Sequence, residues 1–270
     1  MSAKRIPRYI HYCWFGGNEF GPKESKCIES WRRFMPDYEI IRWDESNFDC
    51  AACDYIREAY EKKKWAFVSD YVRLKVMLEY GGLYFDTDVE LIAPIDDILE
   101  RGPFMGFEED CDGKHYGAVA PGLGLGAYPG MDFYRRLLKS YELDHFINCD
   151  GSLNLKNVVE RTTELLIQDG LSVREGIQVV DDITIYPASY FNPKDQWSGV
   201  VTIQSDTRSI HHFGMSWVRP SQKLEKRISA WLISVGLAMD VAVPLSKILA
   251  IICCLDFNRV ANLLKKAVHR

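Results

Sequence analysis

Hydrophobic and polar positions change their spacing repeatedly along the first part of the chain. A short aromatic stretch over 8–14 ends at a glycine-containing loop and predicts a strand. Helical patterns follow over about 23–34 and 54–64, separated by a second short apolar stretch at 38–43. This order of strand, helix, strand and helix predicts an α/β fold with a parallel sheet.

The segment 65–80 predicts a longer helix with a defined end. Its apolar residues, among them Val68 and Val72, recur at approximately helical spacing. Gly81-Gly82 follows the last of them, as a helix C-cap would. The helix is therefore expected to stop at Tyr80.

Two carboxylates interrupt the extended structure that comes next. The stretch 83–85 is too short for anything but a strand, and extended structure resumes at 89–92, after Asp86-Thr87-Asp88. Asp86 and Asp88 therefore stand at the end of a strand, which is where open α/β sheets bind ligands. Because side chains on a strand alternate, the two carboxylates are expected on the same side.

The middle of the chain is expected to hold shorter elements. Residues 117–126 are rich in glycine, and no internal repeat is visible. The predicted elements are helices over about 130–141 and 157–168, and strands over 179–186, 200–204 and 210–213.

The composition changes after Pro220. The stretch 228–255 is apolar, but Asp240, Pro244 and Lys247 interrupt it, so a single transmembrane helix is not expected. Two shorter helices joined near Pro244 are expected instead. The chain is thus divided into a body and a helical appendage, over 1–220 and 221–270.

The appendage has three candidate roles. Its apolar faces can pack on the body, pair with another chain or lie in a membrane interface. Cations that suit anionic lipid flank the apolar stretch: Lys223, Lys226, Arg227, Lys265, Lys266 and Arg270.

Composition is ordinary for a globular protein, with 47% hydrophobic and 26% charged residues. The formal net charge of -5 removes the electrostatic argument for a nucleic-acid partner, because such proteins usually carry a basic surplus. No nucleic-acid partner is therefore expected.

Eight irregularly spaced cysteines favour a reduced cytosolic protein over a disulfide framework. Cys50 and Cys53 form a C-x-x-C pair, but a structural zinc site needs four ligands and no second pair lies at suitable spacing. The basic N-terminus lacks an apolar run, so no signal peptide is expected. The protein is expected in the cytoplasm. If the appendage lies in a membrane interface, the expected position is peripheral, at the inner face of the plasma membrane.

An acid-x-acid pair alone is weak evidence for a site, because chance predicts about five such pairs in a chain with 38 acidic residues. The neighbouring residues give this pair its significance. Asp70 and Arg73 precede it and lie three apart, hence on one helix face. Carboxylates suit a hard divalent cation, manganese or magnesium, that keeps positions open for diphosphate oxygens. The alternative is a solvated turn between strands.

Three stretches together resemble glycosyltransferase family 32. Ser69-Asp70-Tyr71-Val72-Arg73 and Gly81-Gly82-Leu83-Tyr84-Phe85-Asp86-Thr87-Asp88 look like its DXD sugar-binding signature. The opening over 6–17 is similar to the family's first strand and loop, and 211–217 is similar to its late motif. The resemblance implies a GT-A type, Rossmann-like nucleotide-diphospho-sugar transferase domain that retains anomeric configuration.

The resemblance also implies roles for individual residues. Asp88 is expected to bind the metal directly, with Asp86 in the metal shell, and His212 is preferred to His211 as a further metal ligand. The donor-binding residues implied are Trp14 on the nucleobase, Asp70 and Arg73 on the donor sugar and phosphate, Tyr84 beside the nucleotide, Asp86 on sugar hydroxyls, and Ser216 and Trp217 on the diphosphate.

Structural readings of the same residues stay open. Trp14 can be a core aromatic residue, Asp70 and Arg73 can form an intrahelical ion pair, and either histidine can be a hydrogen-bonded core residue. The family often has a Gly-Pro turn where this chain has Asp150-Gly151-Ser152, which leaves the acceptor face undefined. No catalytic base is assigned.

The activity expected from the resemblance is transfer of a hexose to a bacterial capsular or lipopolysaccharide glycan, or to a lipid-linked oligosaccharide. A UDP-sugar is the favoured donor and GDP-mannose the alternative. Two other functions stay open: a toxin-like protein glycosyltransferase, and a non-catalytic scaffold that binds nucleotide-sugar or a membrane.

Overall fold

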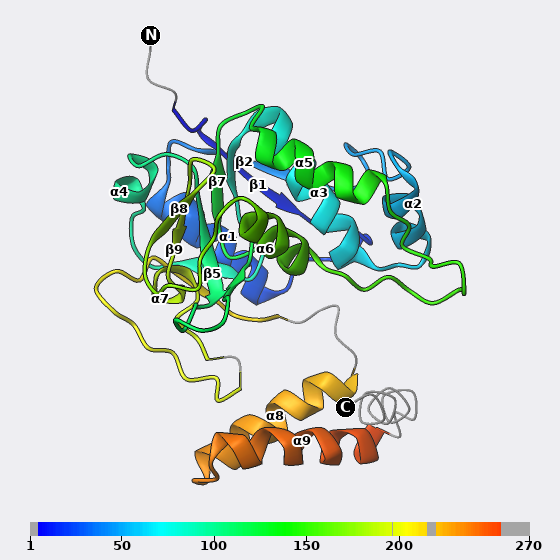
Figure 1. Ribbon diagram of the computed structural model, residues 1–270, viewed down its shortest axis with the longest axis vertical. Helices are drawn as coiled ribbons and strands as arrows, with labels where there is room; N and C mark the ends of the chain where they lie inside the picture. Colours follow the sequence, from blue (N-terminus) through cyan, green and yellow to red (C-terminus); the bar gives the residue numbers. More distant parts are fainter. Residues whose placement is uncertain (1–4, 196, 215–219, 255–270) are drawn as a thin grey trace. The chain divides into compact units, whose positions relative to one another are not determined.

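A computed structural model describes residues 5–195, 197–214 and 220–254 of the chain (Figure 1). The chain forms two compact units. Unit 1 comprises Met1–Pro193 and Ile203–His212, and unit 2 comprises Lys194–Thr202 and Phe213–Arg270.

Unit 1 is built on a mixed eight-stranded sheet with the order β2-β1-β3-β7-β5-β9-β8, and β6 pairs with β5. Its strands are β1 Tyr9–Cys13, β2 Glu39–Trp43, β3 Gly82–Tyr84, β5 Phe104–Glu109, β6 Ala118–Val119, β7 Leu125–Ala127, β8 Gln178–Val180 and β9 Ile183–Tyr186. Strand β1 is parallel to both β2 and β3, and β5 is parallel to β9. The predicted α/β class and the parallel start of the sheet are confirmed.

The remaining pairs of the sheet are antiparallel, with β7 between β3 and β5. A separate two-stranded sheet joins β4 (Val89–Leu91) to β10 (Ser209–His211). This small sheet brings the segment after the acid-x-acid pair next to a segment about 120 residues further along the chain.

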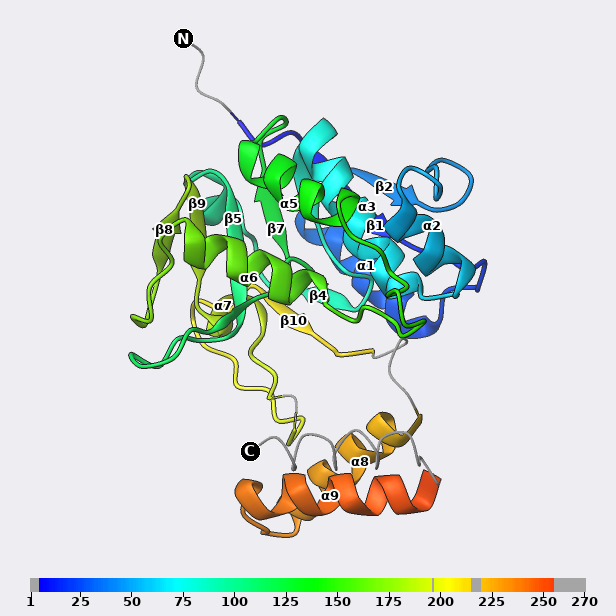
Figure 2. The same ribbon diagram turned by 45° about the vertical axis from the view of Figure 1, so that its right-hand side comes forward.

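Helices cover both faces of the large sheet (Figure 2). The helices of unit 1 are α1 Pro22–Phe34, α2 Asp54–Glu61, α3 Trp65–Tyr80, α4 Asp96–Leu99, α5 Asp132–Glu142, α6 Val158–Gln168 and α7 Ala188–Phe191. One apolar cluster joins α2, α3, α5 and α6 to the sheet, and a second cluster lies against α1, α4 and α7. The strands alternate between them: Tyr84 belongs to the first cluster, while Leu83 and Phe85 belong to the second.

The predicted helix over 65–80 matches α3 at both ends, and the C-cap role of Gly81 is confirmed. Gly81 has φ +63°, and an added Cβ would lie 2.7 Å from Pro129. Its carbonyl accepts a hydrogen bond from Nε2 of buried His11, whose Nδ1 accepts one from Trp43. Burial lowers the pKa of His11 to about 4, so this histidine is a neutral core residue.

Two local predictions were wrong, and strands in the middle of the sheet were not predicted. The expected strand over 179–186 is a hairpin, in which Asp181 and Asp182 at φ +49° and +62° form the turn between β8 and β9. The expected strand over 200–204 has only one isolated bridge, between Lys194 and Val201. Strands β5 and β7 were missed, because their apolar runs include glycines that reduce the strand signal.

Unit 2 contains two helices, α8 Pro220–Ser234 and α9 Met239–Cys254, which pack on each other. The two helices are confirmed, but their junction is not near Pro244, which lies inside α9. The chain turns instead at Gly236, whose φ of +95° breaks the helix. Among the residues described, no helix combines the length and apolarity needed to cross a bilayer.

Candidate metal and nucleotide-sugar site

A tight turn after β3 carries the two carboxylates. The backbone N–H of Val89 donates to the carbonyl of Asp86 at 3.0 Å, so Asp86 to Val89 form a turn and not a continuing strand. The N–H of Asp86 in turn donates to the carbonyl of Gly122 at 3.0 Å. The turn therefore brings the two carboxylates close together. The alternation of side chains along a strand, which the sequence suggested, is not the cause.

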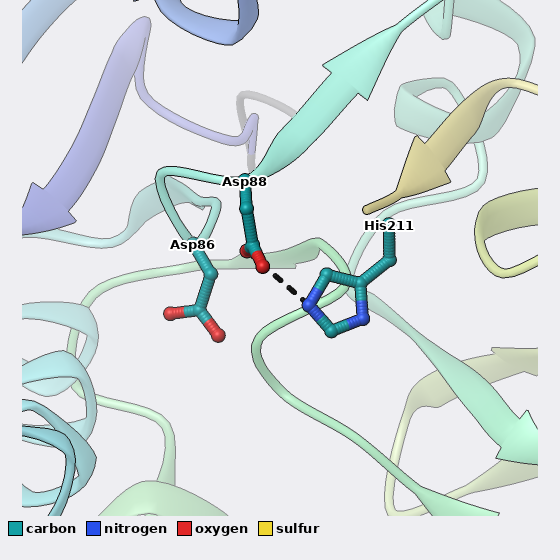
Figure 3. A group of neighbouring side chains, drawn as sticks. All are labelled: Asp86, Asp88 and His211. Atoms are coloured by element: carbon teal, nitrogen blue, oxygen red, sulfur yellow. Dashed lines mark ion pairs between the residues drawn. The ribbon is translucent and has the colours of Figure 1, made fainter. Parts of the chain in front are cut away.

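His211 joins the two aspartates (Figure 3). Strand β10 runs antiparallel to β4 and places His211 opposite Val89. The Nε2 atom of His211 lies 3.2 Å from Oδ1 of Asp88. Asp86, Asp88 and His211 each offer a ligand atom, and these atoms all lie within 4.8 Å of one another.

The structure thus differs from the preference for His212. Nε2 of His212 lies 2.8 Å from Oε2 of Glu90, whose other oxygen lies 2.8 Å from Nζ of Lys26. Neighbouring residues on an extended segment point to opposite sides, so only one of the two histidines can face the aspartates. The pairing of β10 with β4 selects His211.

The three side chains have the chemistry of a divalent cation site. Burial disfavours a charged His211, but the carboxylates of Asp88 and Asp86 outweigh burial and raise its pKa. Burial also raises the pKa of Asp86, although Arg73 acts in the opposite direction. A bound cation would replace the proton shared by such groups, and two carboxylates with one imidazole are ligands that manganese accepts.

Arg73 lies under the site and binds two carboxylates. Its Nη2 is 3.2 Å from Oδ1 of Asp70 and 3.1 Å from Oδ1 of Asp86. Its guanidinium lies 4.8 Å from the centre of the Tyr84 ring, and the Tyr84 hydroxyl donates to Asp86 at 3.0 Å. Arg73 and Tyr84 together hold the Asp86 carboxylate in one orientation.

Asp70 is 6% exposed and lies behind Arg73, away from solvent. Its Oδ2 accepts the N–H of Val158, the first residue of α6, at 3.2 Å. Burial raises the pKa of Asp70 to about 6, against the opposing charge of Arg73. Asp70, Arg73 and Tyr84 therefore act here as supports of Asp86, and direct contact of any of them with a donor stays a prediction.

Gly122 is a functional position that the sequence did not reveal. An added Cβ there would lie 2.0 Å from Oδ2 of Asp86 and 2.9 Å from Nη1 of Arg73. Only glycine lets the backbone approach the carboxylate this closely. The glycine-rich stretch 117–126 was visible, but nothing in its local sequence shows which glycine meets the carboxylate.

Trp14 lies at the same edge of the sheet as the aspartates. It follows β1, and β1 is parallel to β3, so both strands end on one side. Its indole N–H donates to the carbonyl of Asn18 at 2.6 Å, and its ring lies 4.5 Å from that of Phe20. The predicted contact with a nucleobase is untested. Ser216 and Trp217 lie outside the described residues.

A mixed α/β sheet with an acid-x-acid pair where its parallel strands end is the arrangement expected of a protein that binds a nucleotide-sugar through a metal. Residues 21–105 match the family of the glycosyltransferase sugar-binding region containing DXD motif. This match covers Asp70, Arg73, Tyr84, Asp86 and Asp88. The match covers about a third of the chain and confirms the resemblance to family 32 over this region.

Curated relatives are similar over the same part of the chain. Inositol phosphoceramide mannosyltransferases 3 and 1 of Schizosaccharomyces pombe are 34% and 27% identical over 106 and 115 residues. These alignments cover 36% and 38% of this chain, and 28% and 34% of the relatives. Subversion of eukaryotic traffic protein A of Legionella pneumophila is 24% identical over 120 residues, covering 34% of this chain and 18% of that protein. The chain thus spans about a third or less of each relative's length.

Two solved structures of glycosyltransferases are similar at low identity. One is the PaToxG glycosyltransferase, with a TM-score of 0.46 and 16% identity over 62% of this chain and 71% of that one. The other is a glycosyltransferase involved in glycosylation of the major capsid of PBCV-1, with a TM-score of 0.40 and 8% identity over 77% of this chain and 94% of that one.

Proposed function

We propose that the protein is a metal-dependent glycosyltransferase of the GT-A type that transfers a hexose from a nucleotide-diphosphate sugar with retention of configuration. The observation that carries this proposal is the meeting of Asp86, Asp88 and His211 within 4.8 Å where parallel strands end. A divalent cation held there, manganese or magnesium, would offset charge on the departing nucleoside diphosphate. The DXD match covers both aspartates.

The chain's own residues hold this site in shape. Arg73 keeps Asp86 oriented and adds positive charge near the diphosphate position. Asp70 fixes Arg73 from behind, so the guanidinium cannot leave the carboxylate without breaking a buried pair. Trp14 is proposed to stack on the nucleobase, and Ser216 and Trp217 to approach the diphosphate. We assign no catalytic base.

Two donors have separate support. A UDP-hexose is the donor that the sequence argument favours. GDP-mannose is favoured by the names of two relatives, which are mannosyltransferases. The ring of Trp14 can stack on either base, so the choice depends on direct measurement.

The acceptor is proposed to be a glycan or a lipid-linked glycan. The names of the two Schizosaccharomyces pombe relatives describe transfer to a lipid, inositol phosphoceramide. Bacterial surface polysaccharide is the other acceptor class expected from the resemblance. A lipid-linked acceptor would place the protein at the surface of a membrane, on its cytoplasmic side.

Thermal melting with nucleotides tests metal and donor class together. UDP, GDP and CDP are each added with and without manganese, because a ligand that binds only the folded state raises Tm. The proposal expects one diphosphate to raise Tm, and only with manganese. If no nucleotide changes Tm under either condition, the protein is a scaffold with this fold and the proposal fails.

A further inference from the structure

The helical hairpin of unit 2 buries small and polar side chains where a water-soluble hairpin buries apolar ones. Its seam is made chiefly of residues spaced four apart: Ser221, Glu225 and Ser229 on α8, and Ala242, Ser246 and Ala250 on α9. Each of these six is at most 5% exposed. Leu232 and Ile251 add the larger apolar contacts.

The exposed face of α9 is apolar along its whole length. It presents Val241, Leu245, Ile248 and Ile252, which are 49%, 38%, 56% and 62% exposed. Their spacing of four, three and four residues puts them in one strip of the helix. Exposure of this strip to water is unfavourable, because burying each such apolar side chain lowers the free energy.

The exposed face of α8 carries two cations and a tryptophan. Lys223, Arg227 and Trp231 lie four residues apart, hence on one line, and Trp231 is 62% exposed. Lysine, arginine and tryptophan are the residues that anchor proteins where lipid headgroups meet acyl chains. The charge on this line is opposite to that of anionic headgroups.

The two exposed faces are the outer flanks of the hairpin. Both figures show α8 and α9 side by side and running in opposite directions. At 3.6 residues per turn, each exposed strip is turned by about 150° from the buried residues of its own helix, and in the same sense. In an antiparallel pair the two strips therefore form the outer flanks of the hairpin, and both flanks are tilted toward the same side.

Water and lipid select opposite arrangements for a helix pair. In lipid there is no hydrophobic force between helices, so pairs associate through small and polar residues and leave apolar ones facing outward. The seam of serines and alanines, to which Glu225, Leu232 and Ile251 also belong, is closer to the second pattern. The outward valine, leucine and isoleucines of α9 agree with it. An apolar strip beside cations and a tryptophan is the composition of helices that lie in the plane of the interface.

We propose that the α8–α9 hairpin docks on the surface of a membrane that contains anionic phospholipid. The α9 strip enters the boundary between headgroups and acyl chains, and Lys223 and Arg227 contact headgroup phosphates. This deepens the proposed function, which places a lipid-linked acceptor at a membrane. Its test needs neither donor nor metal, so it can fail while nucleotide binding succeeds, and the reverse.

Vesicle co-sedimentation of the full chain is the primary test. The protein is mixed with vesicles of phosphatidylcholine alone, or of phosphatidylcholine with phosphatidylglycerol. It is expected to sediment with the anionic vesicles and to be released by added salt, because the headgroup contacts are screened. Equal absence from both pellets overturns the proposal.

Exposed apolar residues give a matched pair of variants. Ile248→Ser with Ile252→Ser removes the middle and end of the strip, and should weaken vesicle binding at least about tenfold. The control is Leu143→Ser with Val179→Ser, which removes two exposed apolar side chains from unit 1, 77% and 68% exposed. The control should bind like the original protein. Equal binding by the strip variant sinks the proposal.

Exposed cations give a second matched pair. Lys223→Glu with Arg227→Glu should weaken binding to anionic vesicles about fivefold or more. Lys23→Glu with Lys139→Glu makes the same change in net charge on unit 1 and should have a much smaller effect. Equal losses in both would show attraction by net charge alone and would overturn the assignment to this face.

Sedimentation velocity without lipid distinguishes a protein partner. If the strip covers a second copy of the chain, the protein is a dimer that Ile248→Ser with Ile252→Ser dissociates, and vesicles do not bind. That outcome also overturns the proposal. Thermal unfolding of each variant without nucleotide checks that the protein remains folded in every arm.

Discussion

The chain buries two arginines in closely similar ways, and their surroundings differ in charge. Arg73 and Arg161 have side chains that are 6% and 5% exposed, and each guanidinium lies over a tyrosine ring. Arg161 pairs with one carboxylate, Asp144. Its second contact is the carbonyl of Ser140, at 3.2 Å. Around Arg161, positive and negative charge balance.

Arg73 has more negative charge around it than it can neutralise. It binds Asp70 and Asp86, and Asp88 lies beside Asp86 with His211. Burial disfavours charge on both Asp70 and Asp86 and raises the pKa of each. A buried arginine is thus by itself structural, whereas the unbalanced carboxylates beside Arg73 form a place that a cation would fit.

The largest expected effect is the loss of transfer in Asp88→Asn. The amide keeps the shape but loses the charge that a cation needs, so donor turnover with manganese should fall by about a hundredfold or more. Asp37→Asn, whose side chain is 76% exposed, is the matched control in unit 1 and should keep full turnover. A loss in Asp88→Asn well below about tenfold would remove Asp88 from the metal site.

Arg161→Leu should instead reduce stability by about 2 kcal/mol in urea unfolding. The buried pair with Asp144 is lost, but Asp144 is partly exposed and can regain water. Nucleotide and manganese affinity should be unchanged in the folded protein. If manganese affinity fell with stability, the distinction between the two arginines would be broken.

His211→Ala and His212→Ala sharpen the assignment of the metal ligand. Loss of His211 should weaken manganese binding by about tenfold to a hundredfold. Loss of His212 removes its pair with Glu90 and should leave manganese binding unchanged. Titration of manganese into each variant measures the difference. Weaker binding in His212→Ala alone would restore the preference taken from the sequence.

Gly122→Ala should weaken manganese binding by about tenfold through displacement of Asp86. Gly21→Ala is a suitable control, because its added Cβ would meet only the end of the flexible Glu24 side chain. Unchanged affinity in Gly122→Ala would mean that Asp86 can move without cost and is not a positioned ligand.

A smaller effect is expected from pH. The pKa of His211 is raised by Asp88 and Asp86, and only its neutral form can bind a cation. Manganese affinity should therefore be highest above this pKa and fall several-fold as pH is lowered through it. In His211→Ala, the fall should be shallower. Affinity that rises on acidification would contradict the ligand set.

The sequence predicted well those features whose signals are local. Helix α3 has a regular apolar spacing and ends before Gly81. The short stretch that contains Asp86 and Asp88 follows directly after it. The choice between His211 and His212 depends on how β10 pairs with β4, across about 120 residues, so no local pattern could decide it. The turn at Gly236 depends on a positive φ value, whereas the sequence pattern favours a break at Pro244 instead. The hairpin at Asp181 also depends on a positive φ value, inside an apolar stretch that resembles one strand.

Manganese titration followed by electron paramagnetic resonance tests the central claim most directly, because the signal of free ion reports how much is bound. We expect one site per chain in the original protein, tightened by the matching nucleoside diphosphate, weakened about tenfold to a hundredfold in His211→Ala and lost in Asp88→Asn. Equal binding by the original protein and both variants would contradict it, since the ion would then be held elsewhere.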